Sequence, residues 1–334
     1  MSRFLLDRLP GLAAILEPVP LGRWPTPVQR VVGLAEAPEL WIKRDDLSAE
    51  LYGGSKIRNL EWILGDARRR KKRTLLCTGA WGSHLALSLG LYGEAHGFTV
   101  RCVLVPQLED DEVRSNASRL AATGAEVARL GTALHWPTSW LQHRFRRAAD
   151  VYWVAPGGAS PVGSLGLVAA ALELAAQIRS GDLPKPDFIY CAVGSGGTLI
   201  GLAQGLALAG LEATLVGVRV VPRIASALPR RAVMAHRLRR LLERSGAPIP
   251  APHPVVISHD FVGRGYGCPT EFGAAAARRL AEHGGPRLEP VYTEKTFAGL
   301  LSFVATQGLA GRTHLFWNTF DSRLAPNPAS RPQA

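Results

Sequence analysis

The order of apolar segments along the chain constrains its fold more than any other feature. Short runs rich in β-branched and aromatic residues alternate with longer runs whose apolar residues recur at helical spacing. The strand candidates are Leu40–Lys43, Thr74–Thr78, Thr99–Val105, Asp150–Val154, Phe188–Val193, Thr214–Val221, Val255–Ser258 and Thr313–Trp317. The helix candidates include Val113–Thr123, Gly163–Ile178, Thr198–Ala209, Glu271–His283 and Thr296–Gln307. This alternation predicts an α/β protein in which crossover helices join parallel strands.

Length and composition predict a globular protein. The chain has 334 residues, of which 47% are hydrophobic and 20% charged, enough for one large or two modest domains. The apolar stretches look too short or too interrupted for a membrane span, and the first twenty residues lack a clear signal-peptide core. The cysteines show no metal-ligand spacing, and three lie in strand-like runs: Cys77, Cys102, Cys191 and Cys268. We therefore expect reduced, mostly buried thiols, no metal site and a cytoplasmic protein without a membrane partner.

The net charge of +12 raises the question of a nucleic-acid partner. Two runs, residues 68–73 and 230–244, are densely basic. The first run closes a predicted helix, where cations suit the negative end of the helix dipole. The second has leucines on one face and arginines on the other, as in an exposed amphipathic helix. We therefore expect no nucleic acid among the partners.

A single lysine follows a glycine pair in the run Gly53-Gly54-Ser55-Lys56. The glycines allow a tight turn that delivers Lys56 to the start of a helix beginning near Ile57. Backbone N–H groups and the positive end of the helix dipole disfavour the ammonium form there, so the amine can attack a carbonyl group. The alternative is an ordinary surface lysine in a glycine-rich loop.

A glycine-rich turn, Gly194 to Thr198, follows the strand-like run that begins at Asp187 and precedes an apolar helix. Its backbone N–H groups, the hydroxyls of Ser195 and Thr198, and the helix dipole suit a single phosphate group. The alternative is a tight strand-to-helix connection without a ligand. A reactive lysine combined with a site for one phosphate indicates pyridoxal 5'-phosphate as the cofactor.

With these two motifs, the chain resembles the fold-type II pyridoxal-phosphate enzymes of the tryptophan synthase β-like superfamily. It is most similar to the group of 1-aminocyclopropane-1-carboxylate deaminase and D-cysteine desulfhydrase. The matching segments run in the family's order and span nearly the whole chain: Pro25–Val28, Ile42–Leu47, Gly53–Arg58, Asn116–Val127, Gly194–Thr198, Gly265–Gly267 and Pro290–Thr293.

The resemblance implies two open parallel-sheet, three-layer α/β domains with the cofactor in the cleft between them. The large cofactor-binding domain would comprise residues 1–57 and 162–325, and the small domain residues 58–161. The Pro-rich, polar segment 326–334 reads as a disordered tail. Members of the family are usually homodimers, so the resemblance implies a homodimer here.

The resemblance also assigns roles to individual residues. Lys56 would carry the cofactor and move protons at the substrate Cα, and Tyr266 and Tyr292 would be catalytic. Thr293 or Thr319 would face the pyridine nitrogen, and both alternatives stay open. The other cofactor-binding candidates are Ser83, Gly194, Ser195, Gly196, Gly197 and Thr198. The substrate-binding candidates are Gly82, Ser83 and His84.

The chain departs from the family in the segment Gly79-Ala80-Trp81-Gly82-Ser83-His84. The family usually has Ser-Asn-His or Ser-Asn-Gln there, with Asn on the 3'-oxygen of the cofactor and Ser on the substrate. If His84 is in register, Ser83 replaces the Asn and Gly82 replaces the Ser. Ser83 can still donate one hydrogen bond, whereas the hydroxyl at position 82 is lost.

Two more segments depart from the family. Ser55 stands where Asn is usual, and Asn59 where a phosphate-facing Lys is usual, which leaves more of the phosphate charge to the glycine turn or to Arg58. Residues 318–321 read Asn-Thr-Phe-Asp in place of His-Thr-Gly-Gly. We expect this replacement to crowd a backbone turn that normally needs glycine.

The sequence as a whole predicts a pyridoxal-phosphate enzyme of the desulfhydrase and deaminase kind. It would act on a small amino acid by elimination or replacement at Cβ, because a hydroxyl partner of the pyridine nitrogen suits elimination. The altered loop suggests an unusual substrate, so one alternative is an enzyme of specialised metabolism with a different reaction. Another alternative is a degenerate protein that binds the cofactor without catalysis.

Overall fold

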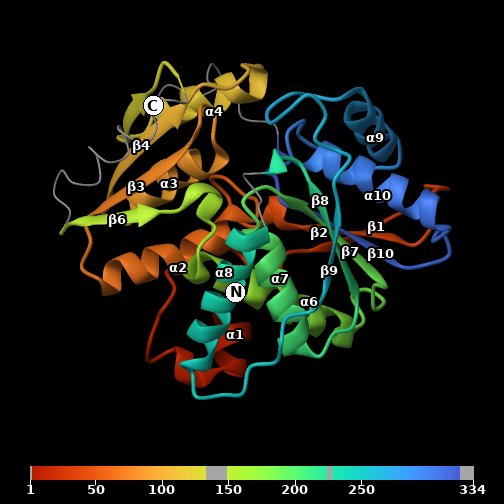
Figure 1. Cartoon of the computed structure of the whole chain (residues 1–334), viewed down its shortest axis with the longest axis horizontal. Coiled ribbons are helices and arrows are strands. Elements are labelled where there is room, and N and C mark those ends of the chain that lie inside the picture. Colours follow the sequence, from red (N-terminus) through yellow and green to blue (C-terminus); the bar gives the residue numbers. More distant parts are fainter. Residues whose placement is uncertain (1, 133–148, 224–227, 324–334) are drawn as a thin grey trace.

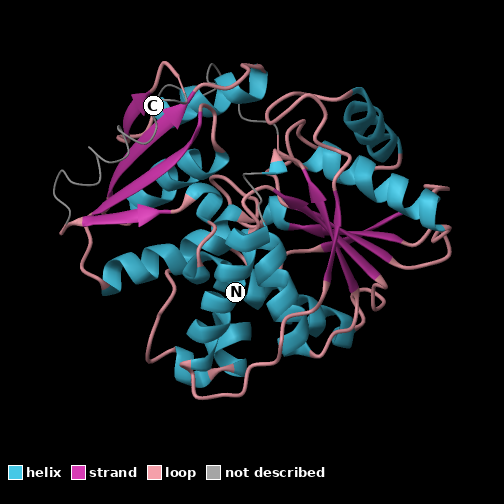
Figure 2. Ribbon diagram, viewed as in Figure 1, coloured by secondary structure: helices cyan, strands magenta, loops and turns pink. Residues whose placement is uncertain are grey.

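The computed structural model describes residues 2–132, 149–223 and 228–323, which form two β-sheets with surrounding helices (Figure 2). The predicted tail, 326–334, lies outside the described residues. The six-stranded sheet has the order β1 (Val28–Val31), β2 (Leu40–Arg44), β10 (His314–Asn318), β7 (Phe188–Val193), β8 (Thr214–Arg219), β9 (Val255–Ser258). The four-stranded sheet has the order β5 (Glu126–Arg129), β4 (Thr99–Val105), β3 (Thr74–Ala80), β6 (Val151–Val154).

Helices join most of these strands. The α-helices are α1 (Ser2–Arg8), α2 (Lys56–Arg69), α3 (His84–Ala95), α4 (Asp111–Ala121), α6 (Pro161–Ser180), α7 (Gly197–Ala209), α8 (Leu228–Glu243), α9 (Glu271–Glu282) and α10 (Thr293–Gln307). Short 3-10 turns are η1 (Pro10–Leu12), η2 (Asp45–Leu47) and η4 (Pro156–Gly158). The predicted α/β class is confirmed, and strands β4, β7 and β9 have the predicted bounds.

The large sheet is mixed, not wholly parallel as expected. Strand β1 pairs antiparallel to β2, with Val28 opposite Lys43 and Val31 opposite Leu40, whereas the other pairs are parallel. Strand β1 escaped prediction because only Val31 of its four residues is buried, so it lacks a hydrophobic pattern. Strand β5 was missed for the same reason, since none of its residues is fully buried.

The large sheet lies between two layers of helices. Helices α6 and α7 share one apolar cluster with strands β7 and β8. Helices α9 and α10 share another with the opposite faces of β2, β7 and β10. The four-stranded sheet packs against α2, α3 and α4, and Figure 1 shows α2 reaching from the centre of the molecule to this smaller sheet.

Helix α6 is long and apolar enough to cross a membrane, the only such helix in the described part of the chain. The expectation that the apolar stretches are too short or too interrupted for a membrane span does not hold for the length and composition of this helix, whose mean hydropathy reaches 1.5. However, 78% of that window is buried inside the protein, where α6 packs against α2 and α7. The core helix of a large α/β domain has the same composition.

A buried group of four charged side chains ties the start of α2 to the large sheet. The Arg58 guanidinium contacts Asp45 at 2.6 Å and Glu173 at 2.9 Å, and Lys43 pairs with Glu173, all fully buried. Opposite charges offset the cost of burying each ion. The possibility that Arg58 contributes to the phosphate site is therefore wrong, because its guanidinium is held inside this ion cluster.

Helix α8 has the expected apolar and basic faces, and the cysteines are reduced as expected. On α8, Leu238 and Leu242 are buried, while Arg237 and Arg240 point outward. All four cysteines are free thiols, and Cys268 alone among them is not buried. Cys77 and Cys102 are opposite each other on β3 and β4, with their sulfur atoms 3.3 Å apart.

Candidate active site

A cavity of about 450 Å³ lies where strand ends of the two sheets face each other. Its walls come from the end of β3 and start of α3 on one side, and the end of β7 and start of α7 on the other. The segments before α10 and after β10 complete it. Open sheets place ligands beyond the carboxyl ends of their strands, so this is the expected location for a site.

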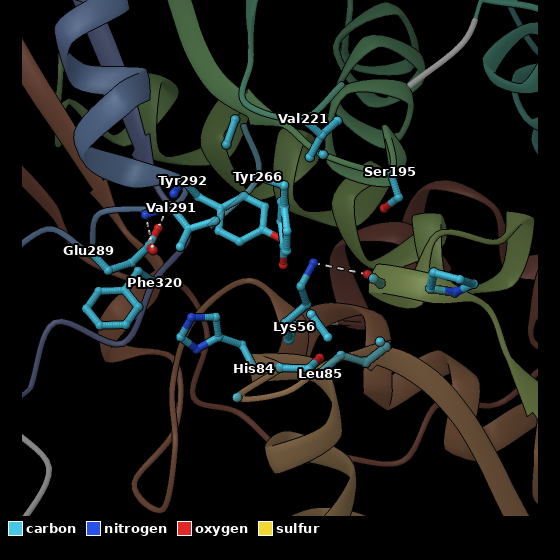
Figure 3. Close-up of a pocket in the computed structure, with 18 of the residues that line it drawn as sticks. Lys56, His84, Leu85, Ser195, Val221, Tyr266, Glu289, Val291, Tyr292 and Phe320 are labelled. Carbon is cyan, nitrogen blue, oxygen red and sulfur yellow. Dashed lines mark hydrogen bonds between the residues drawn. The ribbon is translucent and has the colours of Figure 1, made fainter. Parts of the chain in front are cut away.

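Lys56 is the first residue of α2, as predicted, and its amine points into the cavity (Figure 3). The Nζ atom donates a 3.0 Å hydrogen bond to the carbonyl of Gly157 in η4. Burial lowers the pKa of Lys56 from 10.5 to about 8. A substantial fraction of this amine is therefore neutral near physiological pH, as a nucleophile or base requires.

The glycine turn Gly194–Thr198 lines the cavity and leads into α7. Gly196 has a φ of +91° and is the N-cap of α7, and no side chain caps this helix end. The first N–H groups of α7 consequently keep their donor capacity for an anion. Gly194 also permits a close approach, because a Cβ there would lie 3.1 Å from the Tyr292 ring.

Two tyrosines, Tyr266 and Tyr292, contact each other on the side of the cavity opposite Lys56. The hydroxyls of Tyr266 and Tyr292 are 2.9 Å apart, and their rings meet edge to face. Burial raises the pKa of both phenols, so both are protonated at neutral pH. The pair can therefore donate or relay a proton.

Glu289 is a buried residue of this site that the sequence analysis missed. Its carboxylate accepts hydrogen bonds from the backbone N–H groups of Val291, Tyr292 and Thr293, at 2.7, 2.6 and 2.8 Å. Burial raises the pKa of Glu289 to about 7. It fixes the backbone of Tyr292. The only signal for it in the sequence is an acidic residue shortly before a helix.

The loop before α3 lines the opposite wall with Gly82, Ser83 and His84. Ser83 is the N-cap of α3, and its hydroxyl accepts from the N–H of Ala86 at 3.4 Å. Gly82 has a φ of +79°, and a Cβ there would lie 2.9 Å from the Cα of Val113. A serine therefore does not fit at position 82 without movement of the loop or of α4.

His84 is held by two neighbours. Its Nδ1 atom contacts the Tyr52 hydroxyl and lies 3.3 Å from the Asn116 amide nitrogen. Burial, followed by the charge of Lys56, lowers the pKa of His84 to about 4. The imidazole is therefore neutral, and with Nδ1 accepting these bonds its Nε2 carries the proton.

The expected crowding at residues 318–321 does not occur. Neither Phe320 nor Asp321 has a positive φ, so this turn does not require glycine. The Phe320 ring packs edge-on against His84, with centroids 5.4 Å apart, and Asp321 accepts from the N–H of Gly53 at 2.8 Å. The two larger side chains are thus structural parts of the pocket wall, and Figure 3 shows Phe320 beside His84.

The family model of the pyridoxal-phosphate dependent enzymes matches residues 19–319. The chain belongs to this enzyme family. Its cofactor is therefore pyridoxal phosphate, and the predicted resemblance is confirmed.

Relatives in several reaction classes are similar to this enzyme. Nocardicin C-9' epimerase of Nocardia uniformis subsp. tsuyamanensis is 33% identical over 92% of this chain and 93% of its own. D-cysteine desulfhydrase of Serratia proteamaculans is 33% identical over 84% of this chain and 86% of its own. A crystal structure of a homologue of 1-aminocyclopropane-1-carboxylate deaminase superimposes with a TM-score of 0.80, at 30% identity and 94% coverage of both chains.

The enzyme's pocket fits this cofactor. Ser55 and Thr78 line the cavity, and their hydroxyls are buried without a hydrogen-bond partner, so their bonding capacity remains available to a polar group of a ligand. The amine of Lys56 lies in the same cavity as the uncapped start of α7. These features provide a carbonyl-reactive amine, polar contacts and an anion site in one place.

The enzyme's two candidate threonines lie in different surroundings. Thr319 lines the cavity, and its carbonyl accepts from the N–H of Ser55 at 3.1 Å. Thr293 is buried behind the wall, where its hydroxyl accepts from the N–H of Glu289 at 2.8 Å. Of the two threonines, Thr319 is therefore the one that can contact a ligand in the cavity.

Proposed function

We propose that this enzyme catalyses elimination or replacement at Cβ of a small amino acid. The observation that carries this proposal is Lys56, a buried amine of lowered pKa in one cavity with the uncapped start of α7. The names of the D-cysteine desulfhydrase and deaminase relatives support small amino acids as substrates. The volume of about 450 Å³ must hold both cofactor and substrate, which favours a small side chain.

We propose the following residue roles, which the placement of these residues around one cavity supports. Lys56 holds the cofactor through its amine, and Gly194–Thr198 holds the phosphate. Ser83 contacts the 3'-oxygen of the cofactor, and Thr319 contacts its pyridine nitrogen. When bound, pyridoxal phosphate supplies an electron sink for the negative charge that forms at the substrate Cα.

On the substrate side, the N–H groups at the start of α3 and the Nε2 proton of His84 bind the α-carboxylate beside Gly82. Once free of the cofactor, the neutral Nζ of Lys56 takes the proton from Cα. The phenol of Tyr292, supported by Tyr266 at 2.9 Å, donates a proton to the leaving group at Cβ. Glu289 acts only by holding the Tyr292 backbone.

The test is a direct comparison of substrates. Purified holoenzyme is incubated with D-cysteine, L-cysteine and 1-aminocyclopropane-1-carboxylate, and the release of ammonia and keto acid is measured. We expect a cysteine enantiomer to react faster, because Thr293 and Gly82 replace an acid and a serine of the deaminases. A positioned acid–base group is worth about 10²- to 10⁴-fold in rate. Faster turnover of the cyclopropane substrate would contradict the proposal.

Epimerisation at Cα is a second candidate function. The nocardicin C-9' epimerase relative motivates it, together with the proton carriers Lys56 and Tyr292 on different walls of the cavity. Both functions begin with removal of the Cα proton and differ in the next step. In deuterated water, an epimerase would yield the labelled opposite enantiomer without ammonia, and a lyase would yield ammonia.

We also propose the domain division and the setting of the enzyme. The four-stranded sheet lies entirely within residues 74–154, which supports a small domain of residues 58–161 inside a large domain. The free thiols support a cytoplasmic location. A homodimer is proposed from the family and is tested by light scattering of the purified protein.

A further inference from the structure

A cation beside the phosphate would strengthen its binding, and helix α2 does not supply one. A phosphate monoester carries roughly −1.5 to −2 charges at neutral pH. Asn59 is neutral and donates to the carbonyl of Gly163 at 3.0 Å, and Arg58 is held in the buried ion cluster. Lys56 is committed to the carbonyl end of the cofactor. The glycine turn offers only backbone and hydroxyl donors.

Among the described residues that line the cavity, Arg230 is the only arginine, and Lys56 the only lysine. Arg230 lies in the first turn of α8, and α8 packs beside α7 (Figure 1). The next residue, Arg231, places its Cγ and Cδ atoms 3.1 and 3.2 Å from where a Cβ of Gly196 would lie. The start of α8 thus lies directly against the glycine turn.

The charge of Arg230 is not used elsewhere. Within the described part of the chain it has no ion pair or hydrogen bond, and Arg230 is an exposed residue of the cavity wall. The Nε atom of Arg231 is also buried without a hydrogen-bond partner. Unpaired arginine donors next to an uncapped helix start are suited to a phosphate, because guanidinium can bind two of its oxygens at once.

We propose that Arg230 is the phosphate-binding cation of this enzyme and takes the place of the charge that Asn59 lacks. This inference rests on the proposed location of the phosphate at Gly194–Thr198. It makes the first turn of α8, a segment outside the predicted motifs, part of the cofactor site.

The experiment separates the phosphate from the rest of the cofactor. Apo-enzyme is titrated with pyridoxal 5'-phosphate and with pyridoxal, which lacks the phosphate, and both dissociation constants are measured by absorbance. We expect Arg230→Ala to weaken binding of the phosphorylated form by about tenfold, and to leave pyridoxal binding unchanged. Arg230→Lys should recover part of the loss. Salt should weaken binding to the wild type more than binding to Arg230→Ala.

The matched control is Arg237→Ala, an exposed arginine on the same helix that does not line the cavity. It should leave both affinities unchanged. Equal affinities of Arg230→Ala and wild type for the phosphorylated form, or equal losses for both ligands, would overturn the role of Arg230. If the wild type itself fails to bind pyridoxal 5'-phosphate, the proposed function fails instead, so the two failures are distinguishable.

Discussion

The two halves of the pocket differ in how closely they keep the family's pattern. The retained half comprises Lys56 and the turn Gly194–Thr198, and it has the predicted local structure. The altered half comprises Gly79–His84 and residues 318–321, where the residues that differ from the family's pattern make structural contacts within this protein. Ser83 caps a helix, and Phe320 packs on His84.

The difference shows what kind of constraint each half obeys. The retained half depends on backbone geometry, such as the φ of +91° at Gly196, which few residues other than glycine adopt. Apart from Gly82, whose φ is +79°, the altered half depends on side chains that pack against one another, and such contacts can be exchanged as a set. The retained half should therefore tolerate almost no substitution, and the altered half should tolerate only coordinated ones.

The largest effect is expected at Lys56. Borohydride reduction of the holoenzyme followed by tryptic mapping should place the pyridoxyl group on Lys56, because its amine has a lowered pKa and faces the cavity. Lys56→Ala should abolish the label, and Lys185→Ala, at an exposed site, should keep it. A label on Lys43, or none in the wild type, would contradict the assignment.

The next effect is the pH dependence of cofactor capture by the apo-enzyme. The pKa of Lys56 is lowered to about 8, and only the neutral amine attacks a carbonyl. Capture should thus accelerate about fiftyfold between pH 6 and 8 and level off above, as followed by stopped-flow absorbance. The reference amine is Nα-acetyl-lysine, whose side-chain amine is free. A capture rate that still rises above pH 10 in the protein would show that the pKa of Lys56 is not lowered.

Gly196→Asp should weaken cofactor binding at least tenfold, or about 1.4 kcal/mol. The new side chain meets Arg231 at about 3.1 Å, strains a left-handed backbone and brings a negative charge to the phosphate site. Gly210→Asp is the control, since it also has positive φ but lies at the far end of α7 with open space around it. Equal cofactor affinities of the two folded variants would move the phosphate elsewhere.

In the altered half, Gly82→Ser tests whether the lost hydroxyl can simply be restored. Its Cβ would collide with the Cα of Val113, so it should cost about 1 kcal/mol more in unfolding free energy than Gly97→Ser. Gly97 has a similar φ of +82° and nothing within 4 Å of its Cβ position. Denaturant titration gives the unfolding free energies of both variants. Equal losses would mean that the loop around Gly82 moves to accommodate the serine at little cost.

The smallest expected effect separates the two threonines. Thr319→Val should weaken cofactor binding about two- to fivefold, the size of one neutral hydrogen bond, because Thr319 lines the cavity. Thr293→Val should leave the affinity within about twofold and lower the thermal midpoint instead, since its hydroxyl binds Glu289. A larger loss of affinity for Thr293→Val would reverse the assignment. Titration of the apo-enzymes gives both cofactor affinities, and thermal unfolding gives the midpoints.

Much of the fold and half of the site could be predicted because they depend on local sequence. Strand β7 is a continuous apolar run, and β4 is an apolar run interrupted by Arg101. The glycines before Lys56 and in Gly194–Thr198 indicate the turns at these two places. The role of Glu289 could not be predicted from the sequence, because it depends on burial of the carboxylate and on its hydrogen bonds with backbone N–H groups such as that of Tyr292. The fit of Phe320 could not be foreseen either, because it depends on contact with His84 from a distant part of the chain.

The ion cluster around Arg58 has a mechanical consequence for the reactive amine. Arg58 is two residues after Lys56 and is clamped to Asp45 and Glu173, which belong to the segment after β2 and to α6. The start of α2 is thus anchored beside the turn that leads into α7, even though the rest of α2 runs beneath the smaller sheet. If that sheet swings to admit a substrate, the hinge lies beyond Arg58. The Lys56 amine and the turn Gly194–Thr198 then keep their relative positions, while the wall formed by the loop before α3 moves away.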